Sequence, residues 1–335
     1  MKRGLLALLG LAVPSAWVLH VNHDISQGKT ISETDLYFLS HLPLRKFSRV
    51  VGFVNETQFP SGIQNRLIKT FASLYGINLE ECERDWQQYT SMQEFFTRAL
   101  KAGARPIDHQ AALVSPADGV VLQCGVVGQE GELCIKGVPY DEREFVQEDA
   151  SIPAPLQRGT QRLFCIIYLA PGDYHRFHSP ATWRLCSYTH ISGHLYSVHP
   201  LAVKWLTGLF CLNERVVLKG KWQFGKFIYA PVGATNVGSM AFVFDKKLHT
   251  NIQEDDVLLT GSKVTKNLDC PVTFLPGDEL GTFRMGSSVV LIFDAPKSLE
   301  FCVSPHQKVR MGQPLVSWGK AGNGPFARWR RALGF

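Results

Sequence analysis

The spacing of hydrophobic positions changes near residue 105. Before it, Leu67, Ile68, Phe71 and Leu74 fall near one face of a helix predicted over 63–77. After it, short apolar runs alternate with Gly, Pro and Asp, at 120–122, 163–169, 216–218, 227–232, 241–244 and 289–293. Such runs are typical of strands in a sandwich or barrel. The pattern therefore predicts an α+β protein, with a helical N-terminal region followed by a β-rich body of sandwich or barrel-like type.

A second helix is predicted directly before this change. Ser91 and Glu94 have the spacing of a capping box, in which each side chain binds the backbone at the start of a helix. The helix is expected to run through Leu100 and to end near Gly103.

The N-terminus predicts a membrane anchor. Residues 4–22 carry no formal charge and follow Lys2 and Arg3, but Pro14 interrupts them and their length is marginal for a span of about 20 residues. A signal anchor with its basic end on the cytoplasmic or matrix side fits best. A cleaved signal peptide would need a small-x-small site, and a transit peptide would be rich in Arg and Ser.

We expect five segments. They are an anchor at 1–23, a linker and loop region at 24–58, a helical membrane-facing region at 59–105, the β-rich body at 106–318 and a polar basic tail at 319–335. Arg66 and Lys69 lie beside the apolar face of the helix at 63–77. That helix can pack on a core or lie on lipid, and an anchor upstream favours lipid.

Composition narrows the class of protein. Hydrophobic residues make up 45% and charged residues 19%, which indicates a globular core. The net charge of +6 is dispersed, which argues against a nucleic-acid groove and suits an anionic membrane surface. The eight Cys residues form no Cys-x-x-Cys pair, so we expect reduced thiols and neither a disulfide network nor a zinc site.

Two stretches of the body carry candidate chemistry. The turn at 115–119 holds Asp118, which can bond local backbone or orient an imidazole. The segment 171–180 follows a strongly apolar strand and holds His175 and His178. No third ligand cluster accompanies them, so we expect no metal, and either His can serve as a general base.

A third stretch, 283–294, places Gly286, Ser287 and Ser288 before the apolar run 289–293. A β-turn leading into a core strand is the ordinary interpretation. In the alternative, Ser287 attacks the Gly286 carbonyl and cuts its own chain. Asp, His and Ser together also allow a membrane-anchored serine hydrolase, although the Gly-x-Ser-x-Gly elbow is absent.

The chain resembles the phosphatidylserine decarboxylase family, and its mitochondrial type most. The similarity covers about 60–318 and is carried by 91–107 (SMQEFFTRALKAGARPI), 114–121 (VSPADGVV), 166–180 (IIYLAPGDYHRFHSP), 209–218 (LFCLNERVVL), 232–240 (VGATNVGSM) and 277–297 (GDELGTFRMGSSVVLIFDAPK). The turn at 115–121 also resembles part of lipoyl-type carrier domains, but no lone modifiable Lys or His at a hairpin tip is evident.

The resemblance implies roles for particular residues. Ser287 matches the nucleophile of a self-cleavage between Gly286 and Ser287, Asp118 and His178 match its triad partners, and His175 matches a His that contacts substrate. The family motif is Leu-Gly-Ser-Thr or similar. This chain has Met285 and Ser288 at its ends, and both changes are conservative, so we expect cleavage to be retained. Fragments 1–286 and 287–335 would stay together as a heterodimer.

The resemblance also implies an activity. A pyruvoyl group made from Ser287 would form a Schiff base with phosphatidylserine and release phosphatidylethanolamine and CO₂, which makes the protein a carboxy-lyase. Phosphatidylserine in a membrane is then the partner, with no nucleic acid, and a homo-oligomer is left open. The mitochondrial inner membrane is the expected location, with the endoplasmic reticulum and a bacterial inner membrane as alternatives.

Overall fold

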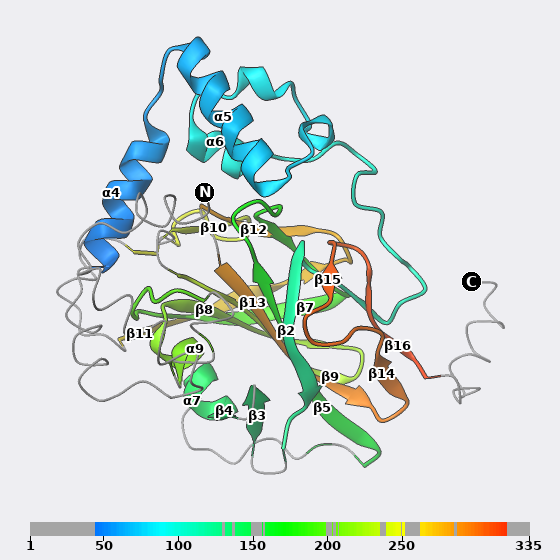
Figure 1. Cartoon of the computed structure of the whole chain (residues 1–335). Coiled ribbons are helices and arrows are strands. Elements are labelled where there is room, and N and C mark those ends of the chain that lie inside the picture. The colour runs from blue at the N-terminus through cyan, green and yellow to red at the C-terminus, as the bar shows by residue number, and fades with distance from the viewer. Residues whose placement is uncertain are drawn as a thin grey trace, which may run out of the picture.

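The computed structural model describes residues 44–319, apart from 129–130, 136–137, 149–155, 157, 199–202, 204–205, 207, 235–238, 249, 252–261 and 285–286. The predicted anchor at 1–23, nearly all of the tail at 319–335, and Gly286 lie outside the described residues. The helices that precede residue 100 gather at one end of a β-rich body (Figure 1). Within the described ranges, no helix has the length and apolar character needed to span a bilayer.

The helical layer consists of α4 (Leu44–Glu56), α5 (Ser61–Tyr75), α6 (Met92–Phe96) and two 3-10 turns, η1 (Leu79–Glu81) and η2 (Trp86–Gln88). The helix predicted over 63–77 is confirmed as α5. It ends at Gly76, which has a φ of 67° and donates its N–H to Ala72 O. Helix α4 lies within the segment expected to be linker and loop.

Helix α6 begins as predicted but is shorter than predicted. Ser91 Oγ accepts a hydrogen bond from Glu94 N at 3.1 Å, which is half of the expected capping box. The helix ends at Phe96, so the predicted continuation through Leu100 is wrong. The reason is tertiary: Leu100 forms an antiparallel bridge with Cys82, and Arg98 reaches the Gly172 carbonyl.

The body is built on an eight-stranded antiparallel sheet in the order β11-β7-β8-β9-β13-β5-β2-β15. Its strands are β2 (Gly119–Val126), β5 (Thr160–Leu169), β7 (Trp183–Ile191), β8 (Arg215–Trp222), β9 (Gly225–Val232), β11 (Lys263–Phe274), β13 (Ser287–Pro296) and β15 (Lys308–Val309). Across the described residues, β11 and β15 are edge strands, each paired on one side only. The sheet is therefore open, and the barrel alternative is wrong.

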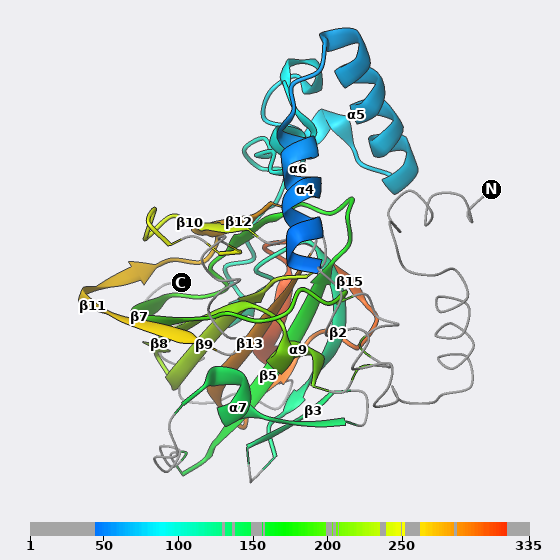
Figure 2. The same ribbon diagram turned by 90° about the vertical axis from the view of Figure 1, so that its left-hand side faces the viewer.

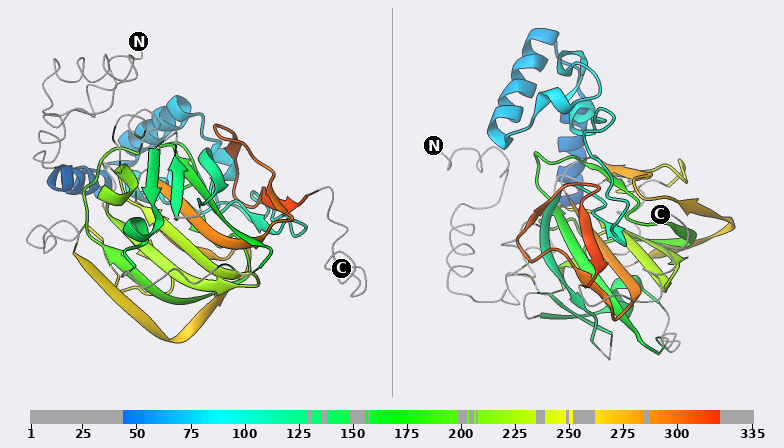
Figure 3. Two further views of the ribbon diagram at one scale, coloured as in Figure 1. Left: turned by 90° about the horizontal axis from the view of Figure 1, so that it is seen from below. Right: turned by 90° about the vertical axis from the view of Figure 1, so that its right-hand side faces the viewer.

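Both faces of this sheet are covered, as the perpendicular views show (Figures 2 and 3). One face packs on two three-stranded sheets, made of β6 (Arg176–His178), β10 (Met240–Phe242) and β12 (Glu279–Phe283), and of β1 (Leu113–Val114), β14 (Leu299–Phe301) and β16 (Pro314–Trp318). The other face packs on β3 (Glu132–Ile135), β4 (Val138–Asp141), α7 (Glu142–Val146) and α9 (Leu209–Leu212). The β-rich, layered body is therefore confirmed.

Strand β13 lies at the centre of this arrangement, between β9 and β5. Leu291 and Phe293 point into one core, whereas Val290 and Ile292 point into the other. A strand buried on both faces explains why 289–293 is continuously apolar rather than alternating.

Candidate active site

Ser287 is the first residue of β13, and it is fully buried. Opposite it, in register, is Leu169, the last residue of β5. The Ser287 Oγ atom has no hydrogen-bond partner within the described structure. A buried hydroxyl without a partner is costly, by about 1–3 kcal/mol, and such groups in native proteins usually have a chemical reason.

The segment that carries the two histidines leaves β5 directly beside Ser287. Asp173 shapes its turn, because its Oδ2 accepts a hydrogen bond from Ala170 N at 2.7 Å. Four residues before Ser287, Phe283 donates its backbone N–H to His175 O at 2.9 Å. The histidine segment therefore lies next to Ser287. Strand pairing joins Ser287 to Leu169, which precedes the histidines, and the Phe283–His175 hydrogen bond joins the chain just before Ser287 to the first histidine.

His175 is a buried, neutral imidazole with one free nitrogen. Its Nδ1 lies 2.8 Å from Asp173 O, and a carbonyl only accepts, so Nδ1 carries the proton. Its Nε2 has no partner among the described residues. Burial lowers the pKa of His175 to about 3, with a smaller contribution in the same direction from the Arg98 charge. His175 therefore presents an unprotonated nitrogen at neutral pH.

His178, in β6, has both ring nitrogens occupied. Nδ1 donates to Gly277 O at 2.8 Å, and Nε2, which must then be the acceptor, lies 3.1 Å from the Tyr174 hydroxyl. Burial lowers the pKa of His178 as well. Tyr174 therefore occupies the nitrogen that would act as the base.

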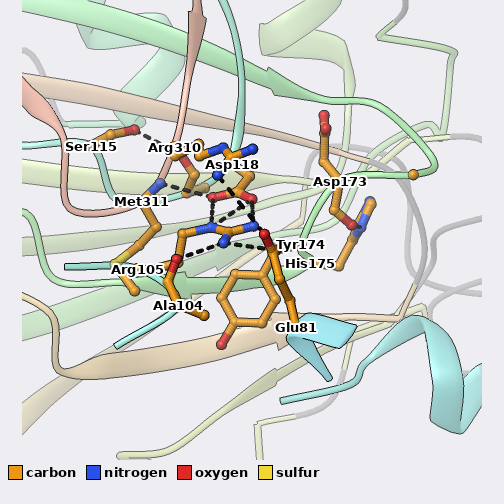
Figure 4. A network of polar contacts seen from close by, with 12 residues as sticks. Glu81, Ala104, Arg105, Ser115, Asp118, Asp173, Tyr174, His175, Arg310 and Met311 are labelled. Carbon is orange, nitrogen blue, oxygen red and sulfur yellow. Dashed lines mark hydrogen bonds and ion pairs between the residues drawn. The ribbon is translucent and has the colours of Figure 1, made fainter. Parts of the chain in front are cut away.

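Asp118 is held by an arginine. Its carboxylate accepts from Arg105 Nε at 2.9 Å and Nη2 at 2.6 Å, and its Oδ1 also accepts from Met311 N at 2.9 Å (Figure 4). Arg105 in turn pairs with Glu81 of η1 at 2.9 Å. Asp118 is expected to orient an imidazole, but neither histidine is among the hydrogen-bond partners found for its carboxylate in the described structure.

The turn that carries Asp118 nevertheless lies against β6. His178 N donates to Pro116 O at 2.8 Å, so the two segments are joined through their backbones. The turn fits because the next residue is Gly119, where a Cβ would lie 2.3 Å from Tyr168 O. The fold therefore places Asp118, both histidines and Ser287 on neighbouring segments around the ends of β5 and β13.

Sequence reasoning missed two residues of this site. The sequence predicts Arg105 only as the end of the helical region at 59–105, and it predicts no role for Tyr174. Arg105 had a signal, because a buried carboxylate requires a partner and Arg105 precedes Pro106, where a helix must stop. Tyr174 had no signal beyond its position next to His175.

Comparison with known proteins shows the same family throughout. The sequence profile of phosphatidylserine decarboxylase matches residues 92–317. The chain is 36% identical over 312 residues to the mitochondrial phosphatidylserine decarboxylase proenzyme of Cricetulus griseus, covering 86% of this chain and 75% of that one. The Caenorhabditis elegans protein of the same name is 38% identical over 280 residues, covering 83% and 72%.

A third relative extends the match further along the chain. Phosphatidylserine decarboxylase proenzyme 1, mitochondrial, of Schizosaccharomyces pombe is 35% identical over 394 residues, covering 92% of this chain and 89% of its own. The matched profile spans α6, the Asp118 turn, the histidine loop and Ser287. The chain therefore belongs to the phosphatidylserine decarboxylase family.

Proposed function

We propose that this protein is a carboxy-lyase that converts phosphatidylserine to phosphatidylethanolamine and CO₂ after cutting its own chain between Gly286 and Ser287. One observation carries the proposal. Ser287 is buried without a hydrogen-bond partner at the start of the central strand, beside a histidine loop, in a chain that matches this family. Family membership argues against the serine-hydrolase and carrier-domain alternatives.

Self-cleavage begins with the Ser287 hydroxyl. A histidine takes its proton, and Oγ attacks the Gly286 carbonyl so that the peptide C–N bond breaks and an ester forms. Loss of the Ser287 α-proton then expels the Gly286 carboxylate and leaves a dehydroalanine at residue 287. Water replaces its nitrogen, which leaves as ammonia, and the product is a pyruvoyl group. The chain becomes two fragments, 1–286 and 287–335.

We assign the base of this step to His178, with Asp118 as its acidic partner, as the family motif implies. In the intact chain Tyr174 and Arg105 hold these two side chains, so the assignment requires both contacts to loosen. His175 has a free, unprotonated Nε2 in a buried position, so it is suited to contact substrate by accepting a hydrogen bond.

The buried surroundings of Ser287 fit the pyruvoyl group. Ser287 is fully buried at the start of β13, and His175 Nε2, on the neighbouring loop, is buried without a partner in the described structure. When formed, the group supplies a carbonyl that accepts the electron pair left by CO₂. Around it, the chain provides an apolar enclosure that excludes water and a neutral imidazole that can accept a hydrogen bond.

The helical layer provides a surface that suits a lipid substrate. Six apolar side chains on α4 and α5 are between 40% and 74% exposed, namely Val50, Phe53, Val54, Ile63, Leu67 and Leu74. Arg66 and Lys69 lie on α5 beside them. An apolar helix face flanked by basic residues is typical of helices that lie in a membrane interface. We propose that this face rests on a mitochondrial inner membrane, to which the N-terminal segment anchors the protein.

Intact-mass measurement of the purified protein tests self-cleavage. We expect a small fragment that starts at a blocked residue 287, and its absence in Ser287→Ala. Ser288→Ala is the matched control, because Ser288 is equally buried but points to the opposite face of β13, and it should still cleave. An active wild-type protein that remains one intact chain of 335 residues would exclude the proposal.

A further inference from the structure

A polar cavity of about 220 Å³ lies where α4 meets the body, and the catalytic roles above do not use it. Its walls come from the helical layer and from the segments around residues 239, 250 and 284 of the body. It contains two cations, Arg49 of α4 and Arg284, and one anion, Glu56. Cavities at the seam between two parts of a protein are preferred ligand sites.

The polar groups of the cavity suit a small anion. Gln93 lines it from α6, and the Gln93 Nε2 donor is buried with no hydrogen-bond partner in the described structure. Arg49 Nη1 contacts Asn251 Oδ1 at 3.3 Å. Asn251 is itself held in place, because its backbone N–H donates to the buried Glu214 carboxylate at 2.9 Å. The cavity thus combines the Arg49 cation, which is held by Asn251, with the Gln93 Nε2 donor.

Arg284 completes this arrangement. Its Nη1 lies 3.3 Å from Glu56 Oε1, but the two side chains are 47% and 54% exposed. An ion pair this exposed is worth about 0–1 kcal/mol, so an incoming anion can replace Glu56 at little cost. Arg guanidinium groups bind phosphate oxygens strongly because they can donate two parallel hydrogen bonds.

The position of Arg284 along the chain links the cavity to the reaction. Arg284 precedes Ser287 by three residues, so their Cα atoms are at most about 11 Å apart. In a serine phospholipid, four bonds separate the amine from the phosphorus, a distance of at most roughly 5 Å. A lipid whose amine is at residue 287 can therefore extend its phosphate toward Arg284 and the cavity.

The mouth of the cavity suits the rest of such a lipid. Phe53 lines the cavity and is also 74% exposed, and Val50 and Val54 on the same helix are 59% and 52% exposed. These apolar side chains would contact glycerol and acyl chains, whereas the two arginines would contact the headgroup. From Phe53 to Arg284 the surface therefore changes from apolar to cationic.

We propose that this cavity binds the phosphodiester of the serine phospholipid through Arg49 and Arg284, with Gln93 as an additional donor. The inference rests on the proposed function, since it names the headgroup subsite of that reaction. A phosphodiester, rather than the serine carboxylate, is the ligand, because a cation bound to the carboxylate would stabilise the substrate more than the transition state that loses CO₂.

Binding can be measured without any chemistry in the uncleaved Ser287→Ala protein. Calorimetric titration with dihexanoyl phosphatidylserine and dihexanoyl phosphatidylethanolamine should give similar affinities, because both lipids carry the phosphodiester. Adding Arg49→Gln or Arg284→Gln should weaken both about tenfold. Arg184→Gln, an exposed arginine on β7, is the matched control and should change neither.

A filling variant tests the site without removing a charge. A Cβ on Gly52 meets nothing within 4 Å, so Gly52→Leu is tolerated by α4 and places its side chain in the cavity. In the cleaved enzyme it should raise KM for dihexanoyl phosphatidylserine about tenfold, with the same fragment pattern as wild type. Glu56→Gln, which frees Arg284, should lower KM about twofold.

Other outcomes identify which idea has failed. If only phosphatidylserine binding weakens in Arg49→Gln and Arg284→Gln, the subsite binds the carboxylate and the phosphodiester assignment is wrong. If inorganic phosphate binds as tightly as the lipids, the cavity is a free-anion site. If KM is unchanged in all variants while wild type decarboxylates, the subsite is wrong and the function stands. A wild type that cleaves but never decarboxylates would contradict the function alone.

Discussion

The β body and the helical layer differ in how deeply they bury their apolar residues. Every residue of β13 from Val289 to Phe293 is at most 2% exposed, and the strand supplies both cores. Helix α5 buries only Gln64, Ile68 and Ala72, and leaves Ile63 and Leu74 more than half exposed. The body is stabilised by its own packing, whereas several apolar side chains of the helical layer remain largely exposed.

This difference in burial suits the two parts to two functions, chemistry in the body and substrate uptake in the helical layer. A reactive group that must exclude water needs a rigid, closed support, which β13 provides. A protein that takes its substrate from a bilayer needs an apolar surface that remains accessible. The two parts are joined at several points, and at one of them Arg105 pairs with Glu81 of the helical layer and with Asp118 of the body.

Arg105→Ala is expected to break this connection with the largest effect. It leaves the Asp118 carboxylate buried without its cation, and the loss of one partner of a buried pair costs about 3–5 kcal/mol. Urea unfolding should show this loss of stability. Arg176→Ala removes the half-exposed pair with Glu279 and should cost less than about 1 kcal/mol. Equal losses in the two variants would contradict the central role of Arg105.

Ile292→Ala tests the packing of the body. Ile292 is fully buried on the central strand, so its truncation removes apolar contacts and leaves a cavity. We expect the free energy of unfolding to fall by about 2–5 kcal/mol, with the binding of lipid vesicles unchanged. Chemical denaturation and vesicle sedimentation measure the two properties separately. A smaller loss than about 1 kcal/mol would show that the body can collapse around the site.

Acid should destabilise the body through its buried histidine. The pKa of His175 is about 3 in the folded chain and about 6.5 in the unfolded chain. Between these values the unfolded chain binds a proton that the folded chain does not, so stability falls as pH falls from 6.5 toward 3. The slope from this residue reaches about 1.4 kcal/mol per pH unit. The burial of His178 acts in the same direction.

Unfolding of wild type and His175→Gln at pH 7, 6, 5 and 4 isolates that contribution. The free energy of unfolding of wild type minus that of His175→Gln should decrease steadily as pH falls below 6.5, and it should remain constant above pH 6.5. Parallel curves across the whole range would show that His175 titrates normally and is not held neutral.

Ile63→Ser is expected to change stability least. Ile63 is 51% exposed on α5, so the free energy of unfolding should change by about 0.5 kcal/mol or less. Binding to vesicles that contain phosphatidylserine should weaken about tenfold if the side chain enters the lipid. Leu275→Ser, at a residue of the body that is 55% exposed, is the control and should leave vesicle binding unchanged. Equal effects of the two variants on vesicle binding would remove the distinction between the two parts.

Much of the fold could be predicted because local patterns encode it. The helix over 63–77 follows from its apolar spacing and is stopped by Gly76, which adopts a left-handed conformation. The central strand follows from an apolar run that is too short for a helix. The prediction failed for α6 because its end is set by Arg98 and Leu100, whose partners Gly172 and Cys82 no local pattern reveals.

The candidate site divides in the same way. Asp118, His175, His178 and Ser287 were found as residue types in recognisable stretches, and the fold places those stretches side by side. Their hydrogen-bond partners could not be predicted. Asp118 is held by Arg105, because a guanidinium offers a charged, two-pronged donor, and neighbouring backbone carbonyls fix the tautomer of each histidine.

The sequence by itself determined the family, the β-rich body and the central strand over 289–293, because apolar periodicity and turn residues act over a few positions. The structure starts that strand at Ser287, within the predicted turn. Only the tertiary structure decided which side chains hold Asp118, which imidazole nitrogen stays free and that Arg49 and Arg284 line one cavity. These features join segments as far apart as Arg49 and Asn251, or Asp118 and Met311. The physical reason is that a buried charge or proton donor pairs with whichever partner the packed fold brings nearest. Which partner that is depends on the folding of the whole chain.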